Sequence, residues 1–188
     1  VGEVRTSFTG QPEVEASLRA TLGEAYLGLG RLGPASEQIE EARRLHDATD
    51  RLDAAGLAAL RLLEARLAQE SNDFDRAVTA SATAVRLLEE EPTAKLPRRL
   101  GALEVLTRSL LLSQRYAEAD SVISLSEALA TGLEGEDRIH RAEILSERAD
   151  LLAFRDADAA AADSLSRLAY ETALAIDPDS PYLGNYMN

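Results

Sequence analysis

Small residues that recur every 42 positions constrain the fold of this chain more than any other sequence feature. Ala35, Ala77 and Ala119 follow one another at this spacing. Further small residues lie seven positions later and twelve positions earlier, namely Ala42, Ala84 and Ser126, and Gly23, Ala65 and Thr107. Small side chains where two helices cross let their backbones approach closely. The pattern therefore predicts stacked helical hairpins, with a bulky apolar residue in each turn (Leu32, Phe74, Tyr116).

Apolar residues recur at helical spacing along nearly the whole chain, and no stretch alternates with period two for long. We expect a first helix from Pro12 to the glycines Gly28, Gly30 and Gly33, and a second helix from Pro34. Asp50 is the expected N-cap of a third helix. The expected ranges of the later helices are 50–71, 75–90, 98–113, 116–130, 137–155 and an eighth ending near 176.

The expected helices group into four antiparallel pairs, residues 12–49, 50–91, 97–131 and 137–178. The fourth pair departs most from the pattern. When the fourth pair is aligned with the others at Ala149, its second helix is expected to begin about five residues later than in the other pairs, around 156–162. We expect residues 1–11 to be partly extended. Residues 179–188 form a tail that starts a further repeat, caps the last pair or joins a self-association surface.

Charge and composition narrow the function classes. The chain carries 20 basic and 33 acidic residues, a net charge of −13, which argues against nucleic acid as a partner because phosphate contacts need a basic surface. It contains no cysteine, which removes disulfides, zinc fingers and thiol catalysis. No uncharged apolar run approaches the roughly 20 residues of a membrane span, and the N-terminus lacks the form of a signal peptide. The first residue is not methionine, so a longer parent protein is compatible with the sequence.

Several motifs resemble known catalytic or ligand-binding motifs, but they lack the neighbouring elements or residues that these functions require. Residues 28–33 spell G-x-G-x-x-G, but they follow an amphipathic helix rather than a strand, so we interpret them as a hairpin turn. His46 and His140 have no second histidine at ligand spacing. A hydrolase with two catalytic carboxylates remains a third alternative, but no spacing selects such a pair. We predict no catalytic residues, no metal and no cofactor.

The first hairpin resembles a known repeat. Leu22-Gly23-x-x-Tyr26, followed by Gly30, Ala35, Ile39 and Ala42, is similar to the tetratricopeptide repeat signature. The resemblance covers about residues 13–178, and the 42-residue spacing is closer to the long-helix variety of kinesin light chains than to the usual 34 residues. It implies an all-α fold, a right-handed superhelix of four helix pairs, and a role in protein–protein interaction.

A narrower resemblance lies near the start of the chain. Residues 8–16, with Leu22-Gly23-Glu24-Ala25-Tyr26, are similar to segments that follow the membrane anchor in some bacterial serine/threonine kinases. It implies the alternative that this chain is a sensing or docking segment of a larger bacterial signalling protein. The location is then the bacterial cytoplasm or, beyond a membrane anchor, the extracytoplasmic side.

In a tetratricopeptide array the first helix of each pair lines the concave face. Arg66 and Arg108 are equivalent positions there, and Glu24 and Asp150 are their equivalents in the outer pairs. The apolar residues that map toward this groove are Leu27, Leu111, Leu112 and Phe154.

Arginine holds carboxylates bidentately, so we predict a protein or peptide partner with acidic side chains. The alternative is that both arginines pair with internal acids such as Glu70 or Glu104. The Lys/Asn set that clamps a C-terminal carboxylate in chaperone-binding relatives is absent, because these positions hold Ala20, Glu24, Leu62 and Arg66. Self-association is compatible with the sequence, and neither nucleic-acid binding nor membrane insertion is expected.

Overall fold

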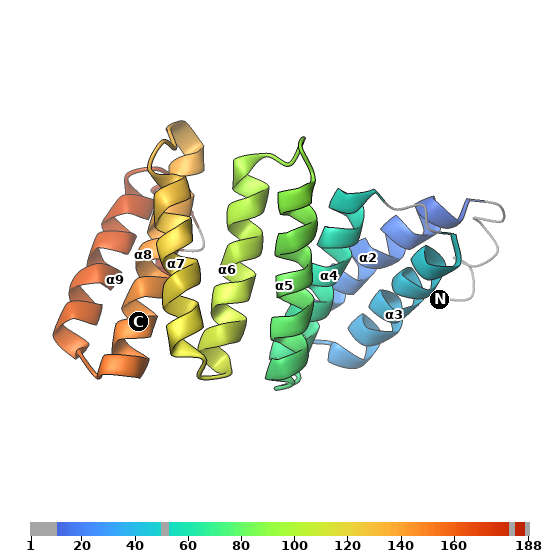
Figure 1. The fold of residues 1–188 in the computed structure, drawn as a ribbon, viewed down its shortest axis with the longest axis horizontal. Coiled ribbons are helices and arrows are strands. Elements are labelled where there is room, and N and C mark those ends of the chain that lie inside the picture. Colours follow the sequence, from blue (N-terminus) through green and yellow to red (C-terminus); the bar gives the residue numbers. More distant parts are fainter. Residues whose placement is uncertain (1–10, 50–52, 181–182, 187–188) are drawn as a thin grey trace. The chain divides into compact units, whose positions relative to one another are not determined.

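The computed structural model describes residues 11–49, 53–180 and 183–186. The chain divides into two compact units, Val1–Ala94 (unit 1) and Lys95–Asn188 (unit 2). Within the described residues the regular structure is entirely helical, so the predicted all-α class is confirmed for them (Figure 1). The expected extended segment, apart from Gln11, and the expected N-cap Asp50 lie outside the described residues.

Unit 1 contains two helical hairpins. The first consists of α2 (Pro12–Gly28) and α3 (Leu32–Thr49), and the second of α4 (Ala54–Glu70) and α5 (Phe74–Glu90). Helix α4 contacts both α2 and α3, so the hairpins stack as neighbours in a helical repeat do. The N-cap of α4 is Asp53, whose carboxylate accepts a hydrogen bond from the Gly56 backbone N–H at 2.7 Å.

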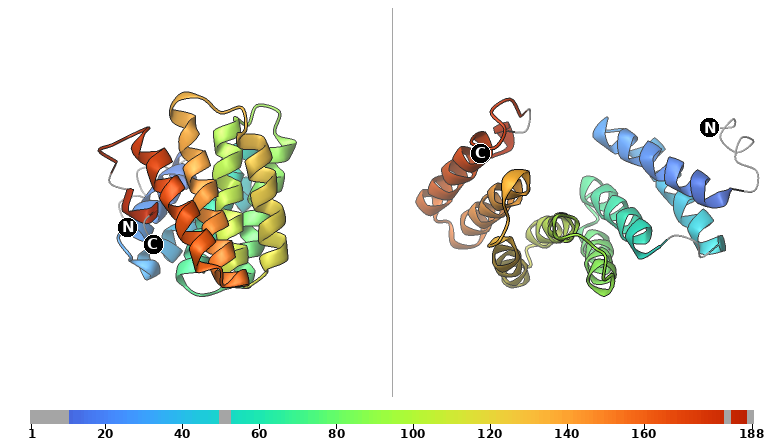
Figure 2. Two further views of the ribbon diagram at one scale, coloured as in Figure 1. Left: turned by 90° about the vertical axis from the view of Figure 1, so that its left-hand side faces the viewer. Right: turned by 90° about the horizontal axis from the view of Figure 1, so that it is seen from above.

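Unit 2 repeats this arrangement. Its hairpins consist of α6 (Leu96–Leu112) with α7 (Tyr116–Ala130), and of α8 (Ile139–Leu151) with α9 (Ala159–Leu174). Helix α8 contacts both α6 and α7, the counterparts of the contacts that α4 makes in unit 1. The right-hand view of Figure 2 shows the two helices of each unit 2 hairpin side by side. We call α2, α4, α6 and α8 the first helices.

The recurring small residues lie in the packed interior. A Cβ atom added to Gly23 would lie 2.7 Å from Cγ1 of Ile39, so α2 rests directly on a side chain of α3. Tyr26 is half-buried and packs against the unit 1 core, with the Arg31 guanidinium 5.4 Å from its ring centroid. The other predicted repeat positions are all buried: Ala35, Ala42, Ala65, Ala77, Ala84 and Ala119.

The turn inside each hairpin has the same backbone conformation. One residue in each turn has a positive φ, namely Gly30 (66°), Asn72 (58°), Gln114 (59°) and Ala157 (52°). In the first three turns the next N–H donates to a carbonyl near the end of the first helix, as in a Schellman motif, with distances of 2.8 to 2.9 Å. The G-x-G-x-x-G stretch spans the end of α2 and the start of α3, which confirms that it is a helix turn.

The fourth hairpin is longer than the others by one residue, not five. Helix α9 begins 43 residues after α7, and the turn residue Ala157 lies 43 residues after Gln114. The added residue is taken up in a π-helical turn, Leu152–Asp156, that continues α8. Such a turn admits one residue without ending the helix. The expected five-residue delay is therefore wrong, and the small buried positions continue at Ala162 and Ala169.

The described part of the C-terminal tail lies against the last hairpin. A 3₁₀ turn, Leu183–Tyr186, contacts α8 and α9, and Tyr186 is buried with Ala142, Ala169 and Ala173. This placement is what the capping alternative predicts for these four residues.

Candidate functional site

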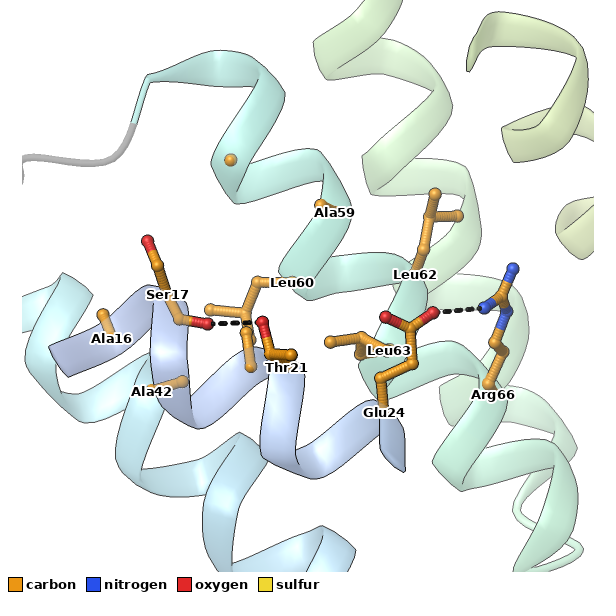
Figure 3. A pocket seen from close by; sticks show the side chains of 12 residues that line it. Ala16, Ser17, Thr21, Glu24, Ala42, Ala59, Leu60, Leu62, Leu63 and Arg66 are labelled. Atoms are coloured by element: carbon orange, nitrogen blue, oxygen red, sulfur yellow. Dashed lines mark hydrogen bonds and ion pairs between the residues drawn. The ribbon is translucent and has the colours of Figure 1, made fainter. Parts of the chain in front are cut away.

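The first helices of unit 1 enclose a pocket of about 370 Å³. We call it the unit 1 pocket. Figure 3 shows α2 and α4 with the side chains that line the pocket, among which Thr21, Leu60 and Leu63 lie between the two helices. The pocket is lined by Ala16, Ser17, Ala20, Thr21 and Glu24 of α2, Ala42 of α3, and Gly56, Ala59, Leu60, Leu62, Leu63 and Arg66 of α4.

Small residues on both walls produce the depth of this pocket. Ser17, Ala20 and Thr21 face Gly56 and Ala59 across it, so no long side chain fills the space. The Thr21 hydroxyl donates to the Ser17 carbonyl at 3.1 Å, which leaves the wall of α2 mostly apolar. The floor belongs to the buried core, because Ala42, Leu60 and Leu63 are all buried.

One ion pair lies at the edge of the unit 1 pocket. Arg66 donates to Glu24 at 3.4 Å, and their side chains are 50 % and 62 % exposed. The two residues are 42 positions apart and occupy equivalent places on α2 and α4. Arg66 thus has an internal acidic partner, although it is Glu24 rather than the adjacent-turn Glu70 that the internal alternative named. An exposed pair with one long contact contributes little stability and leaves most guanidinium donors available to a ligand.

Arg108 has a comparable neighbour in unit 2. It is exposed on α6, and its charge acts on Asp150 of α8, which again lies 42 positions later. Partial desolvation by the surrounding protein raises the pKa of the Asp150 carboxyl, and the positive charge of Arg108 opposes this rise. Both predicted arginines are therefore placed beside the register-equivalent acid of the neighbouring first helix.

The four apolar residues predicted for the groove have different environments. Leu27 is half-buried and packs against the unit 1 core. Leu111 is 8 % exposed and belongs to the buried residues of unit 2, so its place in the groove stays a prediction. Leu112 and Phe154 are 40 % and 63 % exposed. They occupy equivalent positions, at the end of α6 and in the π-helical turn after α8.

Acidic side chains gather on the first helices of unit 2. Glu147 on α8 is buried, and burial raises the pKa of its carboxyl well above the usual range, with the charges of Glu104, Glu143 and Asp150 adding to the rise. Nearby, the Nδ1 atom of His140 lies 2.6 Å from the Glu143 carboxylate, and this contact raises the pKa of His140. Sequence reasoning did not select Glu143 or Glu147. The signal that would have found them is their register, which matches residues of the unit 1 pocket.

Within the described residues, no set of three or more histidine, aspartate or glutamate side chains has an arrangement that could hold a metal ion. The same part of the chain contains no helix that is both long and apolar enough to span a bilayer.

Comparison with protein-family models, with curated proteins and with solved structures gave no match.

Proposed function

We propose that this chain is a non-catalytic interaction module, of tetratricopeptide type, that binds a segment of a polypeptide partner through its first helices. The observation that supports this most directly is the unit 1 pocket, which is open to a ligand, apolar on its walls and edged by the Glu24–Arg66 pair. A volume of about 370 Å³ is within the range of pockets that hold small organic groups.

The ligand that fits these features carries an aliphatic or aromatic side chain next to an acidic one. The apolar side chain would occupy the space between α2 and α4, where its burial provides most of the affinity. The carboxylate would replace Glu24 as the partner of Arg66, in the bidentate geometry that the present pair lacks. Peptide recognition of this kind, by a preformed groove between helices, requires no chemical step.

The test begins with selection from a library of random peptides on the immobilised full chain, followed by fluorescence anisotropy of the selected peptides. Ala59→Trp fills the pocket, and Arg66→Glu reverses the charge at its edge. Each substitution should weaken binding by about tenfold or more. Arg86→Glu, at an exposed position on α5 with the same charge change, is the control and should leave binding within about twofold.

Circular dichroism should show unchanged helical content in all three variants. The proposal is wrong if the library yields no enriched peptide, or if the selected peptides bind Ala59→Trp and wild type equally. Arg66→Glu combined with Arg108→Glu should abolish binding of a partner that uses both arginines, again without loss of helix.

Two wider interpretations stay predictions. One is that the four hairpins continue as a right-handed superhelix, for which small-angle scattering of the full chain is the measurement. The other is that the chain is a regulatory segment of a larger bacterial kinase.

A further inference from the structure

The helix positions that line the unit 1 pocket recur in unit 2 with a different chemistry. The residues 84 positions after eight of the pocket-lining residues of α2 and α4 lie on α6 and α8. In unit 1 these eight positions are Ser17, Ala20, Thr21, Glu24, Ala59, Leu62, Leu63 and Arg66. In unit 2 they are Gly101, Glu104, Val105, Arg108, Glu143, Ser146, Glu147 and Asp150. One acid and one arginine in unit 1 thus become four acids and one arginine in unit 2.

Glu147 is the most informative member of this set. It occupies the position of the buried apolar Leu63, yet it carries a carboxyl group and is itself only 9 % exposed. Neither of its oxygens has a hydrogen-bond partner in the described part of the chain. The Thr107 hydroxyl of α6 lies close enough to favour the charged form, without hydrogen-bond geometry. A buried carboxyl without donors is costly, and a donor supplied from outside would remove that cost.

The neighbouring charges determine which donor fits. Glu104, Glu143 and Asp150 all act electrostatically on Glu147, so the site repels anions. A neutral donor would satisfy the hydrogen bonds but leave the repulsion among the carboxylates. A cation satisfies both requirements, and a guanidinium offers five donors in a planar array that several carboxylates can share.

The burial of these acids is graded from the surface inward. Glu104 and Asp150 are exposed, Glu143 is half-buried and Glu147 is buried. A long side chain with a charged end matches this gradient, since its stem can lie against apolar surface while its head reaches the carboxylates. A metal ion matches it less well, because none of the described acids forms a group that could hold one.

We propose that the face of unit 2 formed by α6 and α8 is a second binding site, and that it takes an arginine side chain of a polypeptide partner between Glu104, Glu143, Glu147 and Asp150. The inference rests on the proposed function in taking a polypeptide as ligand. It uses none of the residues of the unit 1 pocket.

Other titratable groups face the same site. His140 of α8 pairs with Glu143, and Tyr186 of the C-terminal 3₁₀ turn lies near Glu143 and Glu104. Burial of the Tyr186 ring raises the pKa of its hydroxyl to about 12, and the charges of these two glutamates add to the rise. Arg108 lies beside Asp150, and the charge of Asp137 acts on His140. Glu147 is buried, and its carboxyl has no hydrogen-bond partner among the described residues, so cation binding should act mainly on its proton.

The probe is a fluorescein-labelled peptide of alternating glycine and arginine, titrated into the full chain near neutral pH at about 0.15 M salt to screen long-range attraction. The site variant combines Glu104→Gln, Glu143→Gln and Asp150→Asn. The matched control, Glu70→Gln with Glu89→Gln and Glu171→Gln, removes three exposed acids elsewhere. We expect the site variant to weaken binding by about tenfold and the control by less than about threefold.

A second measurement separates a built site from diffuse attraction to an acidic protein. Calorimetry in two buffers of different ionisation enthalpy counts the protons that binding releases. The arginine peptide should release protons from wild type, because a cation at Glu147 favours its charged form, and the release should disappear in Glu147→Gln. This single variant replaces a buried carboxyl with a neutral amide of similar size and is expected to fold.

Equal weakening by the site and control variants would overturn the proposal, as would proton release that persists in Glu147→Gln. Ala59→Trp should bind the arginine peptide as wild type does. If Ala59→Trp loses this binding while the site variant keeps it, the peptide uses the unit 1 pocket and this proposal fails. If the library selection against the unit 1 pocket fails but the arginine peptide behaves as described, only the pocket proposal falls.

Discussion

At the scale of single residues, Gly23 shows how closely α2 and α3 approach. Gly23→Ala would bring a methyl group to 2.7 Å from Cγ1 of Ile39, a β-branched side chain that is 1 % exposed. We expect this overpacking to destabilise the chain by about 1–3 kcal/mol, despite the higher helix propensity of alanine. Urea unfolding followed by circular dichroism measures the change.

Gly101→Ala is the matched control, because Gly101 lies inside α6 with no atom within 4 Å of an added Cβ. There the propensity gain should stabilise the chain by about 0.5–1 kcal/mol. If both substitutions stabilise the chain, α2 and α3 are not as close as the structure has them.

Glu147 gives a prediction about pH. Its pKa in the folded chain is raised, so the folded state binds its proton more tightly than the unfolded state does, and the contribution of Glu147 to stability falls as pH rises above the ordinary value of 4.5. Glu147→Gln should therefore be more stable than wild type near neutral pH. The difference in unfolding free energy should grow with pH, by at most about 1.4 kcal/mol per pH unit, until the folded pKa is passed.

Urea midpoints of both chains between acidic and neutral pH measure this difference, and Glu89→Gln, an exposed change of the same kind, should show almost none. His140 contributes in the same direction, since its raised pKa means that its stabilisation is lost as pH rises through the folded value, above 6.5. It is present in both chains and cancels in the comparison. A constant offset between wild type and Glu147→Gln at every pH would contradict the prediction.

Residue patterns predicted part of the candidate site and missed part of it. Equivalence at 42 residues placed Arg66 and Arg108 on one face, and the structure brings each beside an equivalent acid, Glu24 or Asp150. The alternative of internal acidic partners named Glu70 and Glu104 as examples, whereas the acids beside the two arginines lie on the neighbouring first helices. Leu110, Leu111 and Leu112 are consecutive, and a run of identical residues hides which of them is buried; Leu110 and Leu111 are buried, whereas Leu112 is exposed.

At the scale of elements, the fourth hairpin shows where helical periodicity becomes ambiguous. The register of the first helix was readable from Ala149, but residues 159–162 are four consecutive alanines, and any of them fits the small position of the second helix. The π-helical turn that sets the true register inserts one residue and has no sequence signature of its own. The other hairpins were predictable to within a few residues because bulky Leu32, Phe74 and Tyr116 mark their turns.

The turns also give an element-scale prediction. Ala157 holds φ at 52°, a conformation that costs an alanine about 1 kcal/mol and costs glycine almost nothing. Ala157→Gly should thus stabilise the chain by up to about 1 kcal/mol, and Gly30→Ala, at φ 66°, should destabilise it by a similar amount. Thermal unfolding measures both. Asn72→Gly is the control, and it should stabilise the chain less than Ala157→Gly does, because asparagine tolerates this conformation. Equal stabilisation by Ala157→Gly and Asn72→Gly, or no loss of stability in Gly30→Ala, would contradict the argument.

At the scale of the whole molecule, the division into two compact units predicts how a local defect spreads. In repeat proteins stability is a sum of unit terms and nearest-neighbour terms, so a weakened core opens its own hairpins before distant ones. Ile39 of α3 and Ile123 of α7 form a matched pair, since they are 84 positions apart, equivalent in register and fully buried. Ile39→Val and Ile123→Val each remove one methyl group and should cost about 0.5–1.5 kcal/mol.

Hydrogen exchange of the two variants, read by mass spectrometry peptide by peptide, tests this division. Ile39→Val should speed exchange mainly in α2 to α5, and Ile123→Val mainly in α6 to α9, because each cavity lies within the core of one unit. Fluctuations that open a single unit would then govern access to its own site, so Ile39→Val should weaken selected peptides at the unit 1 pocket more than arginine peptides at Glu147. Uniform acceleration along the whole chain in both variants would mean that the four hairpins open together, and that the two sites cannot be loosened separately.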